Sequence, residues 1–352
     1  MSKLLQKLTM LEAIPGNERE VREFVGAYAQ GKAEIAFDKL GSVILKKAGT
    51  DPDVRIMVAG HMDEIGFIVS EITKDGYIKF VAAGGWWGHV VLSQQFTIRT
   101  KNGKAIRGVV GSKPPHILGA EEKKKVVELA DMFIDIGVST KKEAEKLGIA
   151  IGDMVTPYIE FQHLANKKYL LAKAFDDRVG VGVLLEVLDN LQTTTHPNTY
   201  YGVGTVMEEV GLRGAGTASY MVEPDIGISV DVTIGNDYPG GSKETVLGLG
   251  PCLMVYDSSM VGHVGLRAFV EKTAAELKIP YQLSYLNRGG TDAGKIHLNQ
   301  SGCPSIAICM ASRYIHSHTS IIHQDDYDNT VKLVTALIAR LDRKTVDAIT
   351  YQ

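Results

Sequence analysis

The chain has 352 residues, 45% of them hydrophobic and 22% charged, an ordinary composition for a globular protein of about two domains. Its 38 Lys and Arg nearly balance its 41 Asp and Glu, which leaves a net charge of -3. This balance argues against binding to nucleic acid or to an anionic membrane. Three cysteines are too few for a disulfide framework. No signal peptide or membrane-spanning stretch is recognisable, so we expect a soluble, cytoplasmic protein.

The first thirty residues predict two helices, interrupted by Ile14-Pro15-Gly16, with Asn17 and Glu20 as the capping box of the second. Strands are predicted at 41–45 and 54–59. From about residue 165, predicted helices and strands alternate. The helices are 179–191, 215–221, 264–277 and a last one from about 327; the strands are 201–207, 226–232 and 305–310. Such alternation favours an α/β domain, a mixed sheet covered by helices on both faces.

Residues 70–164 have a different pattern, with short β-runs in place of the alternation. KDGYIKFVAAGGWW and QFTIRTKNGKAIRGVVG are such runs, and Asn102-Gly103 is typical of a hairpin turn. The segment 121–133, which follows them, predicts a helix, and GIAIGDMV then returns to strand and turn. We therefore expect a β-barrel-like unit at 70–164, inserted into an α/β domain formed by 1–69 and 165–352.

Polar residues follow several predicted strands. His61 and Asp63 follow the strand at 54–59, and residues two apart in an extended segment point to the same face. Such a pair is typical of a metal-binding imidazole oriented by a carboxylate, or simply of a hydrogen-bonded strand end. Asp176 and Asp177 begin a predicted helix, where acidic caps are common, so they could bind a metal or merely cap the helix.

Glu208 and Glu209 end an apolar strand before a glycine-rich turn, at the sheet edge where α/β proteins usually bind ligands. One glutamate could bind a metal while the other takes a proton from water; a solvated turn is the plain alternative. Asp231 ends another strand, and His316 follows the strand at 305–310. Nitrogen and oxygen ligands without cysteine favour zinc or cobalt, or else manganese.

Six motifs together resemble one known family. In chain order they are GHMDEIGF, AFDDR, MEEVGLRGA, SVD, GGTDAG and RYIHSH. They resemble the tetrahedral aminopeptidase family of dimetal metallopeptidases, which includes the bacterial glutamyl aminopeptidases. The resemblance implies a metal-dependent aminopeptidase that hydrolyses the N-terminal residue of short peptides. It also implies that 1–69 and 165–352 form the catalytic domain and that 70–164 mediates dimerisation, with dimers assembling into a homo-oligomeric dodecamer.

The same resemblance implies a role for each matching residue. Two divalent metal ions per subunit would be held, one by His61 and Asp231 and the other by Glu209 and His316. Asp176 would bridge the two ions. Glu208 would be the general base, and Asp63 would support His61. Asp177 stands where close relatives often have Asn, so no metal role is expected of it.

The similarity to glutamyl aminopeptidases also implies a preference for N-terminal Glu or Asp. A carboxylate in a partly dry pocket needs a cationic partner, ideally an arginine. Arg288, beside the GGTDAG motif, is the first candidate to bind substrate, and Lys295, Arg313 and His318 are the others.

Other enzymes remain as alternatives. The same site could serve a deacylase or a carboxypeptidase that acts on another amide. A glycoside hydrolase with paired carboxylates is a weaker alternative, because it leaves His61, His316 and Asp231 unexplained.

Overall fold

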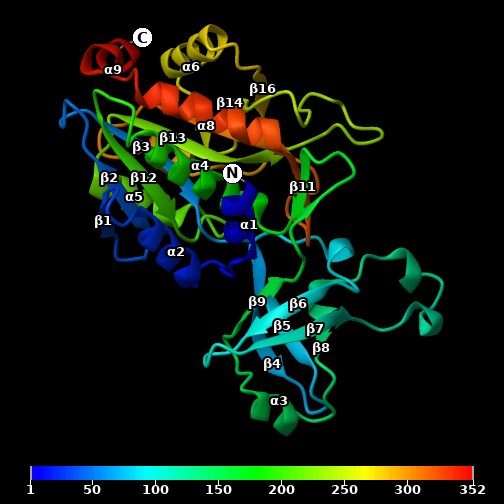
Figure 1. The fold of residues 1–352 in the computed structure, drawn as a ribbon. Coiled ribbons are helices and arrows are strands. Elements are labelled where there is room, and N and C mark those ends of the chain that lie inside the picture. Colours follow the sequence, from blue (N-terminus) through cyan, green and yellow to red (C-terminus); the bar gives the residue numbers. More distant parts are fainter. Residues whose placement is uncertain (1, 351–352) are drawn as a thin grey trace.

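A nine-stranded mixed sheet is the centre of the larger domain in the computed structural model, which describes residues 2–350 (Figure 1). Its strands are β1 (Glu34–Phe37), β2 (Val43–Lys47), β3 (Arg55–His61), β12 (Thr199–Thr205), β13 (Ile226–Ile234), β14 (Cys252–Asp257), β15 (Met260–Val261), β16 (Gln282–Tyr285) and β17 (Ser305–Ser312). They lie in the order β1-β2-β12-β3-β13-β17-β14-β15, and β16 pairs with β14. The central strands β12, β3, β13 and β17 are parallel, so their carboxyl ends lie along one edge.

Helices cover both faces of this sheet, because the central strands carry apolar side chains on both faces. Ile56 and Val58 of β3 join one buried cluster, whereas Met57 and Ala59 join another. The first cluster packs under α1 (Ser2–Met10), α2 (Arg19–Ala29), α4 (Phe175–Asn190), α6 (Val264–Glu276), α8 (Gln324–Ile338) and α9 (Arg343–Thr350). The second packs under α5 (Arg213–Val222) and α7 (Ala293–Ile296). The predicted helix-covered mixed sheet is thus confirmed.

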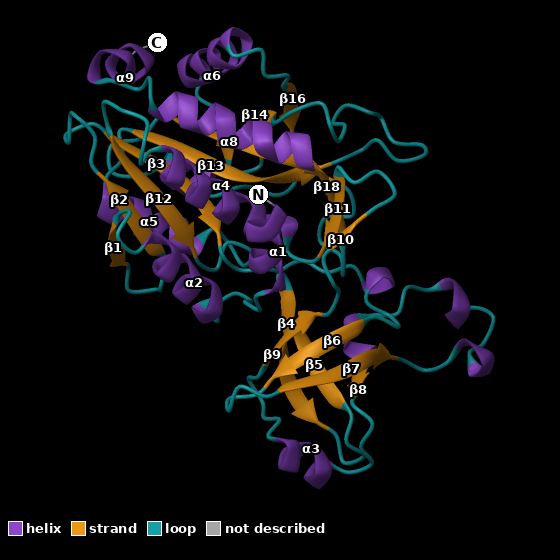
Figure 2. Cartoon of the chain, viewed as in Figure 1, coloured by secondary structure: helices purple, strands orange, loops and turns teal. Residues whose placement is uncertain are grey.

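A closed barrel stands apart from the sheet (Figure 2). Its strands are β4 (Gly66–Ile72), β5 (Ile78–Ala83), β6 (Gln95–Arg99), β7 (Ala105–Gly111), β8 (Phe133–Asp135) and β9 (Met154–Pro157), in the order β4-β5-β8-β7-β6-β9. It has its own core, which includes Phe67, Phe80 and Phe96. The barrel-like fold expected of the insertion is therefore present. Its strands run from Gly66 to Pro157, whereas the predicted bounds of the unit were 70–164.

A small antiparallel sheet lies at the return from the barrel. It consists of β10 (Gln162–His163), β11 (Tyr169–Ala172) and β18 (Ser320–His323). Because β18 follows the loop that carries His316, this sheet fixes the end of that loop. Within residues 2–350, no helix is long and apolar enough to cross a membrane.

Two local predictions are wrong. The segment 121–133 is not an α-helix but contains the short 3-10 turns η3 (Glu122–Lys124) and η4 (Leu129–Asp131) before β8; most of its side chains are exposed, so a helix there would lack a core to pack against. The capping box of the second helix is not formed either. Glu18 is the N-cap of α2, and the Glu20 carboxylate instead accepts a hydrogen bond from the Glu12 backbone N–H at 3.0 Å.

The remaining elements lie in the barrel domain. They are the turns η1 (Gly88–Val90) and η2 (Pro115–Ile117) and the helix α3 (Lys141–Leu147). A capping box between Thr140 and Glu143 begins α3, although no helix was predicted there.

Candidate active site

The predicted metal ligands lie together at the carboxyl edge of the parallel strands. His61 is the last residue of β3 and is paired in register with Thr205, the last residue of β12. Glu208 and Glu209 lie a few residues beyond the end of β12, and Asp231 lies on β13, which pairs with β3 on its other side. This edge is where open α/β sheets bind ligands.

Asp176 lies between two histidines that come from distant parts of the chain. Its Oδ1 is 3.0 Å from His61 Nε2, and its Oδ2 is 3.4 Å from His316 Nε2. His316 Nε2 is also 3.5 Å from Glu209 Oε2, and His61 Nε2 is 3.9 Å from Glu208 Oε2. The structure therefore brings together five of the residues that the sequence motifs singled out, with one carboxylate facing both imidazoles.

Asp231 also belongs to the cluster around His61. Ligand atoms of His61, Asp177 and Asp231 all lie within 4.8 Å of one another, and so do those of His61, Asp176 and Glu209. Each set offers one imidazole nitrogen and two carboxylate oxygens, a combination that suits zinc, cobalt or manganese.

The cluster carries more negative charge than its histidines can balance. Burial raises the pKa of Glu209 to about 8 and that of Asp231 to about 8, and the charge of Asp176 adds to both shifts. Burial also raises the pKa of Glu208 well above its usual value. Glu209 Oε1 is buried and has no hydrogen-bond partner among the described residues. Buried, unpaired carboxylate oxygens are costly, and divalent cations would relieve that cost, so these residues fit metal ions.

The two histidines respond to the same charges in the opposite direction. Burial lowers the pKa of His316, but its hydrogen bond to Asp176 and the charge of Glu209 outweigh burial and raise the pKa to about 10. Burial likewise lowers the pKa of His61, and the charge of Glu208 with the Asp176 hydrogen bond raises it well above the ordinary value. For Asp176 burial raises the pKa, but the hydrogen bonds of His316 and His61 together hold it below its usual value. Both imidazoles thus lie where the surrounding carboxylates favour a positive charge, whether that charge is a proton or a bound cation.

The Asp63 carboxylate supports the glutamates more directly than it supports His61. His61 Nδ1 is 3.0 Å from the Asp63 carbonyl oxygen but 3.5 Å from the Asp63 carboxylate. A carbonyl can only accept, so this contact keeps a proton on Nδ1, and Nε2, which faces the carboxylates, is the nitrogen that a cation would bind. The carboxylate itself accepts hydrogen bonds from the backbone N–H groups of Glu208 and Glu209, both at 3.1 Å.

Two further residues hold the backbone of the site, a task that the sequence predicted for neither of them. Glu18 Oε1 accepts a hydrogen bond from the Met207 N–H at 3.0 Å, next to Glu208, and Met207 has a φ of 55°. Asp177 Oδ2 accepts one from the His61 N–H at 3.0 Å. The Asp177 carboxyl is adjacent to Asp176, so the motif could have suggested it, but Glu18 is 189 residues from Met207 and no local pattern indicates that contact.

The residues predicted to bind the substrate side chain do not lie together around the metal cluster, unlike the predicted metal ligands. Arg288 and Lys295 are exposed. Arg313 lies 3.5 Å from Asp237, so its charge already has a partner. His318 is buried, and its Nε2 is hydrogen-bonded at 2.8 Å to the carbonyl of Gln95 in β6. His318 therefore joins the two domains, and no contact in the described residues links Arg288 or Lys295 to the metal cluster.

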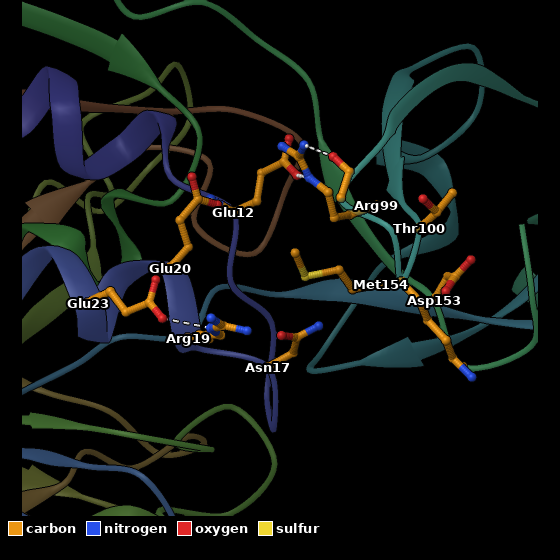
Figure 3. A pocket seen from close by; sticks show the side chains of 12 residues that line it. Glu12, Asn17, Arg19, Glu20, Glu23, Arg99, Thr100, Asp153 and Met154 are labelled. Carbon is orange, nitrogen blue, oxygen red and sulfur yellow. Dashed lines mark hydrogen bonds and ion pairs between the residues drawn. The ribbon is translucent and has the colours of Figure 1, made fainter. Parts of the chain in front are cut away.

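A separate pocket of about 510 Å³ lies between the N-terminal segment and the barrel (Figure 3). None of the predicted site residues lines it. The Arg99 guanidinium donates to Glu12 at 2.8 Å and to the Gly103 carbonyl at 2.9 Å. Its central charges are thus already paired, and we interpret this pocket as part of the domain junction.

Comparison with known proteins identifies the family. The profile of the M42 glutamyl aminopeptidases matches residues 41–333. The glutamyl aminopeptidase of Lactococcus lactis subsp. cremoris is 37% identical, over 98% of this chain and 98% of that protein. The lysyl aminopeptidase of Pyrococcus furiosus is 33% identical, over 96% of each.

Solved structures agree. A TET aminopeptidase from Thaumarchaeota archaeon SCGC AB-539-E09 superposes with a TM-score of 0.96 at 45% identity, covering 99% of this chain and 98% of that one. The Pyrococcus horikoshii TET1 peptidase, which can assemble into a tetrahedron or a large octahedral shell, gives a TM-score of 0.86 at 29% identity, covering 97% and 99%.

A helix-covered sheet that brings two histidines and several buried carboxylates together at its carboxyl edge is typical of a metal-dependent hydrolase. The chain belongs to peptidase family M42, and it is a peptidase with the aminopeptidase function of that family.

Proposed function

We propose that the protein is a dimetal aminopeptidase that removes the N-terminal residue of short peptides. The observation that carries this proposal is the position of Asp176, which presents one oxygen to His61 and the other to His316. A carboxylate shared in this way is suited to bridge two cations. His61 and Asp231 would hold one ion and Glu209 and His316 the other, with zinc or cobalt preferred and manganese as the alternative.

When bound, the two ions supply positive charge that polarises the scissile carbonyl and makes water more acidic. The residues of the chain provide the proton transfer. Glu208 takes a proton from the attacking water and delivers it to the leaving amine. Its side chain is only 9% exposed, and Asp63 fixes its backbone, so its carboxylate is held beside His61.

The test is metal analysis of the purified protein together with a peptide panel. We expect about two divalent ions per chain, and His61→Ala or His316→Ala should each lose metal as well as activity. Peptides with a free amino terminus should be cleaved, and N-acetylated versions should not. Cleavage of blocked peptides, or release of the C-terminal residue, would instead indicate the deacylase or carboxypeptidase alternative. Hydrolysis of a β-glucan that resists chelators would indicate a glycosidase.

The side-chain preference and the assembly are further parts of the proposal. Glutamyl, leucyl and lysyl anilides, tested on the wild type and on Arg288→Ala, measure the preference for acidic residues expected from the sequence. A wild type that prefers the leucyl substrate contradicts that preference, whereas an unchanged Arg288→Ala variant contradicts only the role of Arg288. We also propose that the chain forms dimers through the barrel and that these assemble into a dodecamer.

A further inference from the structure

A pocket of about 740 Å³ lies directly beside the metal cluster, where the barrel domain meets the catalytic domain. One wall is formed by residues 314–319, and the other by Gly85, Trp86, Trp87, His89, Val90 and Gln94. His316 belongs both to this pocket and to the cluster, because its Nε2 faces Asp176 and Glu209. A group in this pocket is therefore next to the place where a scissile bond must lie.

The barrel wall carries two tryptophans, of which one is held in place by the barrel and the other is exposed to solvent. Trp86 Nε1 donates to the Gly66 carbonyl at 3.0 Å, and its ring stacks on Phe67 with centroids 4.8 Å apart. Trp87 is 61% exposed and touches His89, with ring centroids 4.5 Å apart. Trp86 is thus committed to the barrel core, whereas Trp87 has free apolar surface to offer a ligand.

The opposite wall is a loop held in an uncommon conformation. Tyr314 has a φ of 67° and His316 a φ of 55°, values that non-glycine residues adopt mainly where the surroundings enforce them. Ser317 Oγ donates to the Tyr314 carbonyl at 2.6 Å, and the His316 Nδ1 contacts the Gly85 carbonyl at 3.1 Å. These bonds hold the 55%-exposed ring of Tyr314 opposite the barrel wall.

The chemistry of the walls selects the occupant. No Lys, Arg, Asp or Glu is among the described residues that line this pocket. The lining includes three histidines, of which His316 faces the metal cluster, His318 Nε2 is bonded to the Gln95 carbonyl and His89 contacts Trp87. A charged side chain would therefore lose water there without finding a carboxylate, lysine or arginine in the lining, whereas an apolar or aromatic side chain would gain buried apolar area and ring contacts.

We propose, building on the aminopeptidase function above, that this pocket binds the side chain of the second residue of the substrate and favours an apolar or aromatic one. An enzyme that removes a single residue needs a closed end for the amino terminus and an open side for the rest of the peptide. The exposed rings of Trp87 and Tyr314 show that this pocket opens to solvent, so it lies on the leaving side.

The kinetic test keeps the first residue constant and varies the second. Among Leu-Phe, Leu-Leu, Leu-Glu and Leu-Lys, the first two should have a kcat/KM at least about tenfold higher, since apolar pockets discriminate by such factors. Trp87→Ala and Tyr314→Ala should each reduce this difference to within about threefold. Tyr220→Ala, which removes a 70%-exposed ring from α5 outside the pocket, is the matched control and should leave the ratio unchanged.

A binding test does not depend on turnover. Trp86 and Trp87 are the only tryptophans of the chain, and both line the pocket, so tryptophan fluorescence reports on its occupancy. In the metal-loaded Glu208→Gln protein, Leu-Phe should change the fluorescence at lower concentration than Leu-Glu does.

The outcomes separate the inference from the function on which it rests. Equal kcat/KM values for all four dipeptides, or variants that change the preference for the first residue, would overturn the pocket assignment but leave the aminopeptidase intact. Failure to cleave any free-amino peptide would overturn the proposed function itself.

Discussion

Glu208 and Glu209 are neighbours in the chain, yet their side chains face different groups. Both backbone N–H groups bind Asp63. The Glu208 carboxylate then faces His61, and that of Glu209 faces His316. The segment beyond β12 therefore presents two adjacent carboxylates to two different histidines.

This difference leads to the first prediction. Glu208→Gln keeps the size of the side chain but cannot accept a proton, so turnover should fall about a hundredfold or more. Both metal ions should remain, as measured by plasma emission spectrometry on the purified variant. Turnover near the wild-type value would remove Glu208 from the role of general base.

Glu18 supplies the second prediction at this scale. It is 3% exposed, and its Oε1 accepts the N–H groups of Met207 and Gly16 at 3.0 and 2.7 Å. Glu18→Ala removes the acceptor and frees the segment before Glu208. Because a misplaced catalytic group slows the chemical step, kcat should fall by on the order of tenfold to a hundredfold, with little change in KM. Glu18→Gln retains an acceptor oxygen and should keep most of the activity.

The control for Glu18 is its neighbour Glu20. Glu20 also accepts a backbone N–H, that of Glu12 at 3.0 Å, but it has no contact with Met207. Glu20→Ala should therefore leave kcat near the wild-type value. If Glu18→Ala loses only thermal stability and keeps its kcat, Glu18 is a structural residue and does not position the site.

At the scale of elements, a buried ionic cluster fastens the N-terminal segment to α4. The Arg178 guanidinium is fully buried and donates to the carbonyls of Leu8 and Leu11 at 2.7 and 3.0 Å. Glu64 binds Arg178 at 3.2 Å and is also bonded to the buried Lys173. Since Glu64 adjoins Asp63 and Arg178 adjoins Asp177, this cluster supports both sides of the active site.

Removal of the carboxylate from this cluster is the third prediction. Glu64→Ala leaves two buried cations unpaired, and breaking a buried pair costs about 3–5 kcal/mol of unfolding free energy. Urea denaturation monitored by circular dichroism measures this loss. Glu23→Ala removes a 62%-exposed partner of Arg19 and should change stability by less than about 0.5 kcal/mol. A similarly small loss for Glu64→Ala would show that the cluster contributes little.

The start of α8 gives a prediction about pH. Asp326 accepts the N–H groups of Gly248 and Gly250, both at 2.7 Å. Burial raises its pKa to about 6, and the charges of Asp325 and Asp237 add to the shift. The folded protein therefore holds this proton more tightly than the unfolded chain does, so this group stabilises the fold at low pH and loses that contribution as the pH rises through 6.

The fourth prediction compares the wild type with Asp326→Asn, which has no titrating group there. Between pH 8 and pH 5, the unfolding free energy of the wild type should rise by about 1 kcal/mol relative to that of the variant. Other titrating groups occur in both proteins and cancel in this difference. A difference that does not vary with pH would contradict the shifted pKa.

The elements that the sequence predicts well are those whose pattern reflects burial. The strand predicted at 226–232 is β13, and the helix predicted at 179–191 overlaps α4, because long apolar runs leave few alternatives. The proposed metal ligands could be singled out because most of them stand at or just beyond the end of a predicted apolar strand. By contrast, the contact of Glu18 with Met207 depends on how distant segments pack. The charged segment 121–133 has helix-forming residues, but it has no apolar core against which a helix could pack.

At the scale of the whole molecule, the barrel contributes to the active site itself. The Gly85 carbonyl contacts His316 at 3.1 Å, and the Gln95 carbonyl contacts His318 at 2.8 Å. Arg99 of β6 pairs with Glu12 of the N-terminal segment at 2.8 Å. The position of His316, and with it the proposed second metal ion, therefore depends on the insertion as well as on the sheet.

The last prediction concerns the proposed role of the barrel in assembly. Phe67 of β4 and Val155 of β9 are paired in register, so the chain enters and leaves the barrel at one place, and a short glycine linker can replace the domain. The shortened chain should sediment as a monomer, whereas the intact protein should form dimers and larger assemblies at micromolar concentration. The shortened chain should also lose peptidase activity, because the barrel contacts to His316 and His318 are lost. A strictly monomeric intact protein would contradict the proposed assembly, and a shortened chain that still forms the large particle would place the contacts on the catalytic domain instead.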